Sequence, residues 1–467
     1  MKRLLFTLLC AALFAGCSDK KLGDDEGHGG NAKKEIPDDM ELAFPDPIFR
    51  AYVLENFDTD KDGKISREEA EAVTYISVNK YSSTPDNERI ASLEGIQYFT
   101  NLTNLSCYYN KLTELDVTHN PALTQLRCYN NQLTKLNVSG CSALTWLNCS
   151  DNQLTELDVT QNPALTWLWC EQNQLTELNV TQNTALEFLY CYDNQLTELD
   201  VTQNTALTDL ECYSNQLTEL DVTQNTALEF LYCYDNQLTE LDVTQNTALD
   251  YLYCYSNQLT TLDVTHNPAL TRLDCEYNQL TELDVTQNPA LTLLRCNSNQ
   301  LTELNVTHNP ALETLPCYSN QLTELDVTQN PALETLHCYS NQLTELDVTQ
   351  NTALTYLSCY NNQLTTLDVT QNTVLEILYC HNNQLTELDV THNTALEQLW
   401  CDSNQLTELD VSKTNLGNST SSWPLICSPM DGSGLETLYL KEGWTIKNIY
   451  PERNNSFVPA NTDIRFR

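Results

Sequence analysis

The sequence predicts a β-rich solenoid, and three of its features carry this prediction. Cysteines recur every 21 residues from Cys107 to Cys401, which spans most of the 467-residue chain. Within each interval, apolar and polar residues alternate over two short stretches, which is the periodicity of half-buried strands. Glycine is scarce, at 12 residues, which excludes a collagen-like chain and disfavours a calcium-binding β-roll built on glycine turns. We therefore expect short, equal turns that stack as parallel strands.

Each 21-residue unit contains the same pattern twice. The two halves of one unit match in the order Leu186, Leu189, Cys191 and Asn194, followed by Leu196, Leu199, Val201 and Asn204. This spacing resembles the nested 21-residue class of bacterial leucine-rich repeats, and the resemblance covers about residues 90–412. It implies parallel short strands on two faces, with Leu, Cys and Val pointing inward and Asn at the bends. Because both sides would hold strands, we expect only weak curvature.

The ends of the array differ from its repeats. We assign residues 41–89 to a small α-helical N-terminal cap, 90–412 to the solenoid and 413–467 to an irregular β C-terminal cap. Ile90–Ile96 forms the entry turn of this arrangement, and Gly434–Leu440 restores one strand-like unit. Caps are expected because an exposed end turn would pair with other strands. The apolar residues expected to shield the last turn are Trp444, Ile446, Ile449 and Phe457.

The N-terminus carries the marks of an export signal. Two basic residues precede an apolar run from Leu4 to Phe14, followed by Ala15, Gly16 and Cys17. This ending resembles a bacterial lipobox, which implies that residues 1–16 are removed and that Cys17 carries a lipid anchor. Residues 17–40 are polar and form a flexible tether in this interpretation. The alternative is an ordinary secretory signal with an incidental cysteine.

Residues 58–69 have the spacing of a complete EF-hand loop. The expected Ca²⁺ ligands are Asp58, Asp60, Asp62, the Lys64 carbonyl, Ser66 and Glu69. The flanks agree, since Asp46-Pro47 can begin an entry helix and Ser66 can cap a short exit helix. We expect a weak structural calcium site, and the alternative is an acidic loop that never fills with metal.

The fifteen cysteines that recur from Cys107 to Cys401, here called the ladder cysteines, have three possible interpretations. They occupy the same inward position as Val201 in the other half-repeat. We favour buried thiols that pack as small apolar groups, with scattered disulfides as the alternative. Zinc binding is disfavoured because His337 and His381, which adjoin ladder cysteines, should point outward.

Aromatic residues gather at outward positions beside the inward Leu and Cys. We expect them to form a ligand-binding face, and the alternative is that they only stabilise the sheet. The thirteen candidates are Trp146, Trp167, Trp169, Phe188, Tyr190, Tyr192, Tyr213, Phe230, Tyr232, Tyr234, Tyr251, Tyr253 and Tyr255. On the opposite side, Asp200, Asp221 and Asp242 share one column that we interpret as solvated scaffold. Mutual repulsion should raise their pKa values or recruit cations, so a cation-binding ladder is the alternative.

Charge and composition limit the function. A formal net charge of -41 argues against binding nucleic acid. No catalytic cluster is apparent, since His119, His266, His308 and His392 share one bend and lie at least two turns apart, so we expect no enzyme.

The whole chain resembles an internalin-like surface lipoprotein. The resemblance implies a lipid-anchored protein at the bacterial outer membrane, displayed at the cell surface, with an adhesin-like role in binding a protein partner, including a host protein. The first alternative is a glycan-binding accessory lipoprotein, because aromatic platforms also stack on sugar rings. Edge-to-edge assembly of solenoids is a further alternative, although we expect a monomer.

Overall fold

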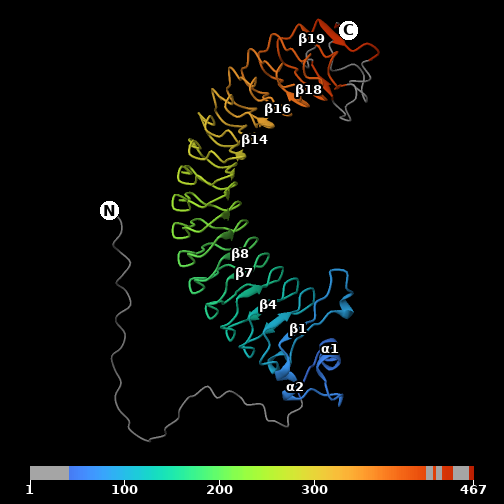
Figure 1. Cartoon of the computed structure of the whole chain (residues 1–467), viewed down its shortest axis with the longest axis vertical. Helices are drawn as coiled ribbons and strands as arrows, with labels where there is room; N and C mark the ends of the chain where they lie inside the picture. Colours follow the sequence, from blue (N-terminus) through green and yellow to red (C-terminus); the bar gives the residue numbers. More distant parts are fainter. Residues whose placement is uncertain (1–41, 417–423, 428–433, 445–461) are drawn as a thin grey trace, which may run out of the picture. The chain divides into compact units, whose positions relative to one another are not determined.

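The computed structural model describes residues 42–416, 424–427, 434–444 and 462–467. All of them belong to one compact unit, Glu41–Arg467, which Figure 1 shows as a stack of short turns. The expected signal, tether and Cys17 anchor, together with Ile446, Ile449 and Phe457, lie outside the described residues. Within the described part of the chain, no helix is long and apolar enough to cross a membrane.

Helices lie near the N-terminal end of this unit. They are α1 (Pro47–Phe57), α2 (Arg67–Ala72) and the short 3₁₀ helices η1 (Asp86–Glu88) and η2 (Ile96–Tyr98). The first strands are β1 (Tyr75–Ser77), β2 (Asn104–Ser106), β3 (Glu114–Asp116), β4 (Gln125–Arg127), β5 (Lys135–Asn137), β6 (Trp146–Asn148) and β7 (Trp167–Trp169). They are followed by β8 (Phe188–Tyr190), β9 (Asp209–Glu211), β10 (Phe230–Tyr232), β11 (Tyr251–Tyr253), β12 (Arg272–Asp274), β13 (Leu293–Arg295) and β14 (Thr314–Pro316). The last are β15 (Thr335–His337), β16 (Tyr356–Ser358), β17 (Ile377–Tyr379), β18 (Gln398–Trp400), β19 (Glu408–Asp410), β20 (Leu425–Ile426), β21 (Thr437–Leu440) and β22 (Asp463–Phe466).

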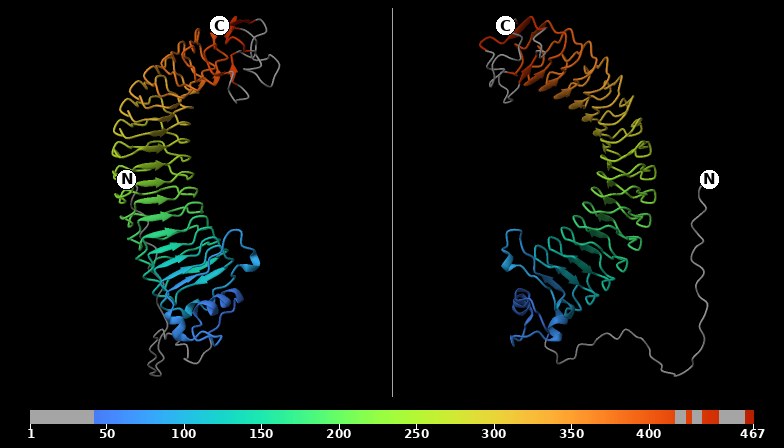
Figure 2. Two further views of the ribbon diagram at one scale, coloured as in Figure 1. Left: turned by 45° about the vertical axis from the view of Figure 1, so that its right-hand side comes forward. Right: turned by 180° about the vertical axis from the view of Figure 1, so that it is seen from behind.

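One parallel sheet of 17 strands runs along the array, which confirms the predicted solenoid. Its register is regular from β2 to β18, where each strand pairs with the residues 21 positions later, as Leu189 does with Leu210. The central residue of each strand points inward, and Leu189, Cys191, Leu199 and Val201 are all buried. The sheet lies on the concave side of a curved coil (Figures 1 and 2).

The second side of the coil differs from the prediction of two equivalent strand faces. Hydrogen-bonded strands form there only near the two ends, as β3 with β5 and as β19 with β21 and β22. In a curved coil the turns fan apart on the outer side, beyond the ~4.8 Å that a ladder requires. There the Asp200 carboxylate accepts hydrogen bonds from Thr202 N at 2.9 Å and Oγ1 at 2.6 Å, so the backbone N–H is satisfied locally. The coil is therefore more curved than expected.

Two columns of asparagine hold adjacent turns together at the bends. In the first, Asn215 Nδ2 donates to the carbonyls of Cys191 and Cys212, each at 3.1 Å, and its Oδ1 accepts from Leu196 N at 2.9 Å. In the second, Asn225 Nδ2 donates to the carbonyls of Val201 at 2.9 Å and Asn204 at 2.8 Å. These buried amides satisfy backbone groups that the turns would otherwise leave unpaired.

The ladder cysteines are buried in the core, as predicted. Their backbone takes part in the sheet, as shown by Cys233 N, which donates to the carbonyl of Tyr253 at 2.9 Å. Burial first, and the neighbouring Cys212 next, raise the pKa of the Cys233 thiol well above its ordinary value, so the thiol stays protonated. A protonated, buried thiol is a poor nucleophile and metal ligand.

Both ends of the sheet are extended by the caps. At the N-terminal end β1 pairs with β2, and Asp46 connects α1 to the entry turn. One oxygen of Asp46 caps α1 through Phe49 N at 3.0 Å, and the other accepts from Ala91 N at 2.8 Å. At the C-terminal end β20 pairs with β18, and β21 occupies the strand-like unit expected at Gly434–Leu440.

Candidate binding face and calcium loop

Three columns of side chains project from the concave sheet. Relative to each ladder cysteine they stand at positions −3, −1 and +1, as Phe188, Tyr190 and Tyr192 do around Cys191. Because the sheet is parallel and in register, equivalent positions of successive turns lie side by side. The sequence columns are therefore spatial stripes, and the thirteen predicted aromatic residues share one face.

The first part of this face is a group of indole and phenyl rings. Trp167 is stacked between two rings, with centroids 5.2 Å from Trp146 and 3.8 Å from Phe188. Trp169 stacks on Tyr190 at 5.5 Å. A cation already lies on this surface, since the Arg127 guanidinium stands 4.8 Å from the centroid of Trp146.

Tyrosines at position +1 form a continuous stack over four turns. The ring centroids of Tyr192, Tyr213, Tyr234 and Tyr255 are separated by 4.2–4.3 Å, with interplanar angles of 9–11°. The faces of the two inner rings, Tyr213 and Tyr234, are covered by their neighbours. This column therefore presents ring edges and hydroxyl groups, rather than ring faces, to solvent.

All thirteen predicted aromatic residues are half-buried. Both interpretations of the sequence pattern thus have structural support, since the rings stabilise the sheet by stacking and also form the surface of its concave side. In the columns at −3 and −1, the ring contacts of later turns are edge-to-face, as between Phe230 and Tyr251 and between Tyr232 and Tyr253. A second cation, Arg272, lies 5.0 Å from the centroid of Tyr251.

An acidic break interrupts the aromatic face at β9. Asp209 and Glu211 stand where neighbouring turns have aromatic rings, and Glu171 stands at the same position as Tyr192, one turn earlier. Burial raises the pKa of Glu171 to about 7. Burial, followed by repulsion from Asp209 and Glu171, raises the pKa of Glu211 to about 7.

A second aromatic group, which the sequence interpretation missed, follows in the later turns. Its residues stand at the same positions, −3, −1 and +1 relative to a ladder cysteine, so a search of these positions in the later repeats would have identified the group from the sequence. Tyr318, Tyr339, Tyr360 and His381 stack with centroids 4.3 Å apart. Tyr356, Tyr379 and Trp400 join His337 in the adjacent columns, around a shallow depression of about 550 Å³. His337 and His381 do lie on the outward side, as predicted, although both are half-buried.

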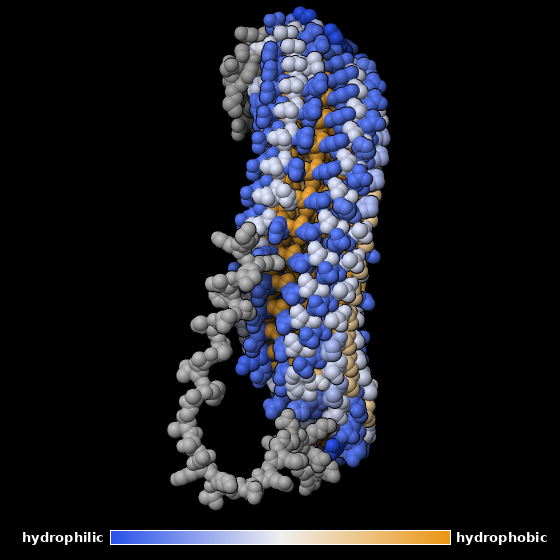
Figure 3. Space-filling view, turned by 90° about the vertical axis from the view of Figure 1, so that its left-hand side faces the viewer, coloured by the Kyte–Doolittle hydropathy of each residue, from blue (hydrophilic) through white to orange (hydrophobic). Residues whose placement is uncertain are grey.

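The uniform acidic column on the opposite side behaves differently from the prediction. Figure 3 shows a narrow apolar stripe between hydrophilic columns on this convex side. The expectation of raised pKa values was wrong, because hydrogen bonds from the Thr202 side chain and backbone lower the pKa of Asp200. Hydrogen bonds from Thr244 lower the pKa of Asp242 in the same way. Because each carboxylate accepts hydrogen bonds within its own turn, a bound cation would stabilise this column only weakly.

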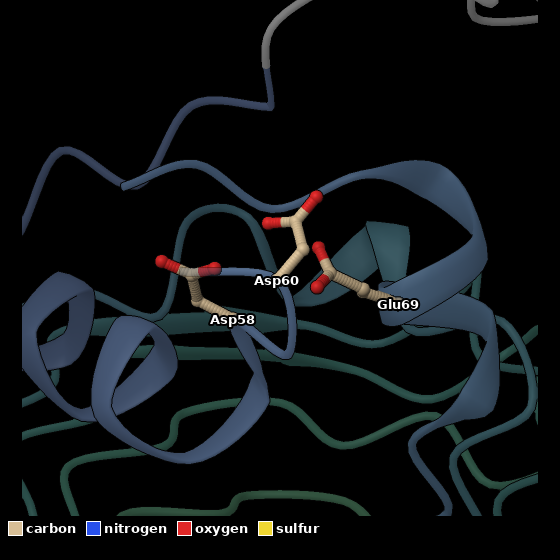
Figure 4. A group of neighbouring side chains, drawn as sticks. All are labelled: Asp58, Asp60 and Glu69. Atoms are coloured by element: carbon tan, nitrogen blue, oxygen red, sulfur yellow. The ribbon is translucent and has the colours of Figure 1, made fainter. Parts of the chain in front are cut away.

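The predicted calcium ligands lie in the loop between α1 and α2, except Glu69, which lies in the first turn of α2. Oxygens of Asp58, Asp60 and Glu69 lie within 4.8 Å of one another (Figure 4). Asp58 Oδ1 is buried and has no hydrogen-bond partner, which leaves a desolvated acceptor beside the other two carboxylates. These three residues therefore fit a hard cation.

Among the predicted carboxylate ligands, Asp62 does not join this group. Asp62 Oδ1 accepts from Lys64 N at 2.8 Å, and Ser66 Oγ donates to Glu69 Oε2 at 3.0 Å. Gly63 has φ 84°, in the left-handed region that favours glycine, and its N–H donates to Asp58 Oδ2 at 2.9 Å. Ser66 also caps α2 in a capping box with Glu69, as expected.

The stacked turns, inward Leu columns and asparagine ladders define a leucine-rich-repeat solenoid. Two family descriptions match the sequence: "Endo-beta-N-acetylglucosaminidase EndoS LRR domain" over residues 44–183, and "Leucine Rich repeats (2 copies)" over residues 331–372. A search of curated proteins finds no match.

Solved structures extend this result. The functional domain of InlJ from Listeria monocytogenes, which includes a cysteine ladder, is 38% identical, with 85% of this chain and 81% of that chain covered and a TM-score of 0.68. A Leptospira interrogans leucine-rich-repeat protein is 24% identical over 89% and 98% of the two chains, with a TM-score of 0.60. The plant receptor RGFR1, solved in complex with RGF2, shares the fold at 18% identity over 79% and 65%, with a TM-score of 0.62. The chain belongs to the leucine-rich-repeat family and is similar to the internalin-like InlJ.

The buried Glu171 predicts a pH dependence of stability. Its pKa lies near 4.5 in an unfolded chain and at about 7 in the fold, so the folded state holds the proton more tightly. This stabilisation is complete below about pH 4.5 and is lost as the pH rises through about 7. Glu171→Gln, which stays neutral, should raise the free energy of unfolding by about 1–3 kcal/mol at pH 8.5 and by much less at pH 5.

Urea denaturation at the two pH values measures this effect. Glu198→Gln removes the same charge from an exposed position on the convex side and is the matched control. Equal gains for Glu171→Gln at pH 5 and pH 8.5 would show that the carboxyl ionises normally.

Proposed function

We propose that this protein is a non-catalytic, lipid-anchored surface protein that holds a protein partner on its concave aromatic face. The half-buried aromatic rings of the concave sheet carry this proposal, because Tyr and Trp dominate the energetics of protein interfaces. The fold agrees, since the internalin-like relative and the other leucine-rich-repeat neighbours suggest protein–protein binding. An adhesin-like role is the particular form of binding that we propose.

The stacking geometry favours a protein partner over a glycan. A sugar ring packs its C–H face on a free aromatic face, but Tyr213, Tyr234 and Trp167 each have both faces covered. Edges and hydroxyl groups, which this face does offer, suit the mixed apolar and hydrogen-bonding contacts of a protein interface. A glycan partner remains the alternative that the same experiment tests.

Replacement of Tyr190, Tyr232 and Tyr253 together by Ala tests the aromatic face. The three residues stand in the −1 column around the centre of the first aromatic group. Truncation of three interface tyrosines at about 1 kcal/mol each should weaken partner binding about 100-fold. Wild-type and variant proteins are compared on a host-protein array and a polysaccharide panel, with circular dichroism as the check on folding.

The matched control changes the other side of the same turns. Asp200, Asp221 and Asp242 are replaced by Asn, which already stands at this position as Asn179 and Asn305. The proposal is supported if a protein binds the wild type and the Asn variant but no longer binds the tyrosine variant. Binding only to polysaccharides, or equal binding by both variants, contradicts it.

We further propose that the loop between α1 and α2 holds one structural Ca²⁺. Asp58, Asp60 and Glu69 would hold the ion, and its binding would link the two cap helices across the loop. A weak extracellular site with a Kd near 0.5 mM would contribute about 1.4 kcal/mol at 5 mM calcium.

Calcium should therefore raise the melting temperature and protect residues 45–75 from proteolysis. In Asp58→Asn the calcium-dependent increment should disappear, whereas Glu88→Gln, an exposed change outside the loop, should keep it. Comparison of each variant with and without calcium separates metal binding from intrinsic stability. An unchanged melting temperature and protease pattern in the wild type would refute the site.

The anchor and location are proposed from the sequence alone. The Phe14–Cys17 ending supports removal of residues 1–16 and lipidation of Cys17, and the polar residues 18–40 support display away from the membrane. Labelling of cells with a palmitate analogue should mark the wild-type protein, while Cys17→Ser should remain unlabelled and leave the membrane fraction. Labelling that persists in Cys17→Ser would identify another attachment.

A further inference from the structure

Three carboxylates form an acidic cluster inside the first aromatic group. Asp209 and Glu211 lie on β9, and their strand neighbours on either side are Phe188 and Tyr190 in one turn and Phe230 and Tyr232 in the next. The Tyr190 hydroxyl donates to Asp209 Oδ2 at 3.0 Å. Glu171 follows Trp169 by two residues, and Trp169 pairs with Tyr190, which in turn pairs with Glu211, so the three carboxylates occupy one part of the face. The cluster is thus enclosed by aromatic rings.

Two of these carboxylates each have one buried oxygen without a hydrogen-bond partner. Glu171 is only 8% exposed, and its Oε2 has no hydrogen-bond partner. Asp209 Oδ1 and the indole N–H of Trp169 are also buried without partners. In the part of the chain that the structure describes, none of the three carboxylates has a Lys, Arg or His nitrogen within 4.0 Å. Unpaired buried acids are costly, and at neutral pH an incoming cation would relieve that cost.

The rest of the same face shows how cations are accommodated on it. The buried Asp274 is paired with Arg295, at 3.3 Å between Nη1 and Oδ2. Arg127 lies over Trp146, and Arg272 lies over Tyr251. The concave surface therefore already combines carboxylates, aromatic rings and guanidinium groups, and the cluster around Glu171 has the first two of these components without the third.

A bare metal ion fits this cluster poorly. Among the described residues, only the loop carboxylates of Asp58, Asp60 and Glu69 bring three ligand oxygens within 4.8 Å of one another. Glu171, Asp209 and Glu211 are more widely spread and are separated by aromatic side chains. An extended organic cation can contact several carboxylates and also pack against Trp and Tyr rings.

We propose that Glu171, Asp209 and Glu211, with the rings of Trp169, Tyr190 and Tyr232, form a subsite for a Lys or Arg side chain of the protein partner. The inference rests on the proposed function, since it names the chemistry of the partner at the same face. The formal net charge of -41 would also attract a basic partner over longer distances. The partner segment is thus basic and is inserted among aromatic side chains.

Peptide binding to two charge-matched variants tests this subsite. The probe is an acetylated, amidated trilysine peptide in 0.15 M salt, with a triarginine peptide as the second probe and a side-chain-acetylated trilysine as the neutral control. One variant is Glu171→Gln/Asp209→Asn/Glu211→Gln. The other is Glu198→Gln/Glu219→Gln/Glu240→Gln, which removes three exposed charges from the opposite side. Melting temperatures confirm that both variants are folded.

We expect the cluster variant to bind the basic peptides at least tenfold more weakly than the wild type, and the control variant to bind them as the wild type does. Trp fluorescence should change on peptide binding in the wild type and the control only. Equal losses in the two variants would mean diffuse attraction to an acidic surface, and no loss in either would mean binding elsewhere. Either result overturns the subsite, as does stronger binding of the neutral peptide.

Once a protein partner of the aromatic face is identified, its binding to the cluster variant and to the tyrosine variant tests this inference and the proposed function separately. If that partner binds the cluster variant as tightly as the wild type but loses affinity for the tyrosine variant, the subsite is wrong and the proposed function stands. If basic peptides distinguish the charge variants but a protein partner binds the tyrosine variant undiminished, the proposed use of the aromatic face fails while the cationic subsite remains.

Discussion

Equal turn length is the constraint on which the whole structure depends. Every turn between Cys107 and Cys401 has 21 residues, so the bend asparagines of successive turns lie over one another, except where Cys141 replaces one of them. Asn215 can then bond to Cys191, Cys212 and Leu196 in two turns at once. An inserted residue would break those bonds and turn inward Leu and Cys side chains toward solvent. The array tolerates substitution at outward positions because the inward ones fix the register.

The same register produces the binding face. A parallel sheet in register places residues 21 apart beside each other, so repeated tyrosines become a stack such as Tyr192, Tyr213 and Tyr234. Stacking stabilises the sheet and holds the rings in fixed positions, so little side-chain freedom is lost when a partner binds. Stability and recognition are therefore properties of the same contacts, and no choice between the two is required.

The acidic residues on the two sides of the coil differ in burial and hydrogen bonding, and their pKa values shift in opposite directions. On the convex side, Asp200 is satisfied by Thr202 of its own turn, which lowers its pKa and leaves little demand for an external partner. On the concave side, Glu171 is buried with one carboxylate oxygen unpartnered, and burial raises its pKa to about 7. A chain with a net charge of -41 thus has acids of two kinds, and only their surroundings distinguish them.

The sequence by itself determined the period, the inward Leu, Cys and Val positions, the cap helices and the aromatic columns, because these follow from local spacing and side-chain alternation. It also contained the second aromatic group at Tyr318, Tyr339 and Tyr360, which the register rule identifies. The tertiary structure alone decided the curvature, since that depends on how far the turns separate on the outer side, where Asp–Thr contacts replace a backbone ladder. It alone also decided that Glu171 is buried and Asp200 is not, because desolvation depends on the side chains of neighbouring turns and no local pattern records it.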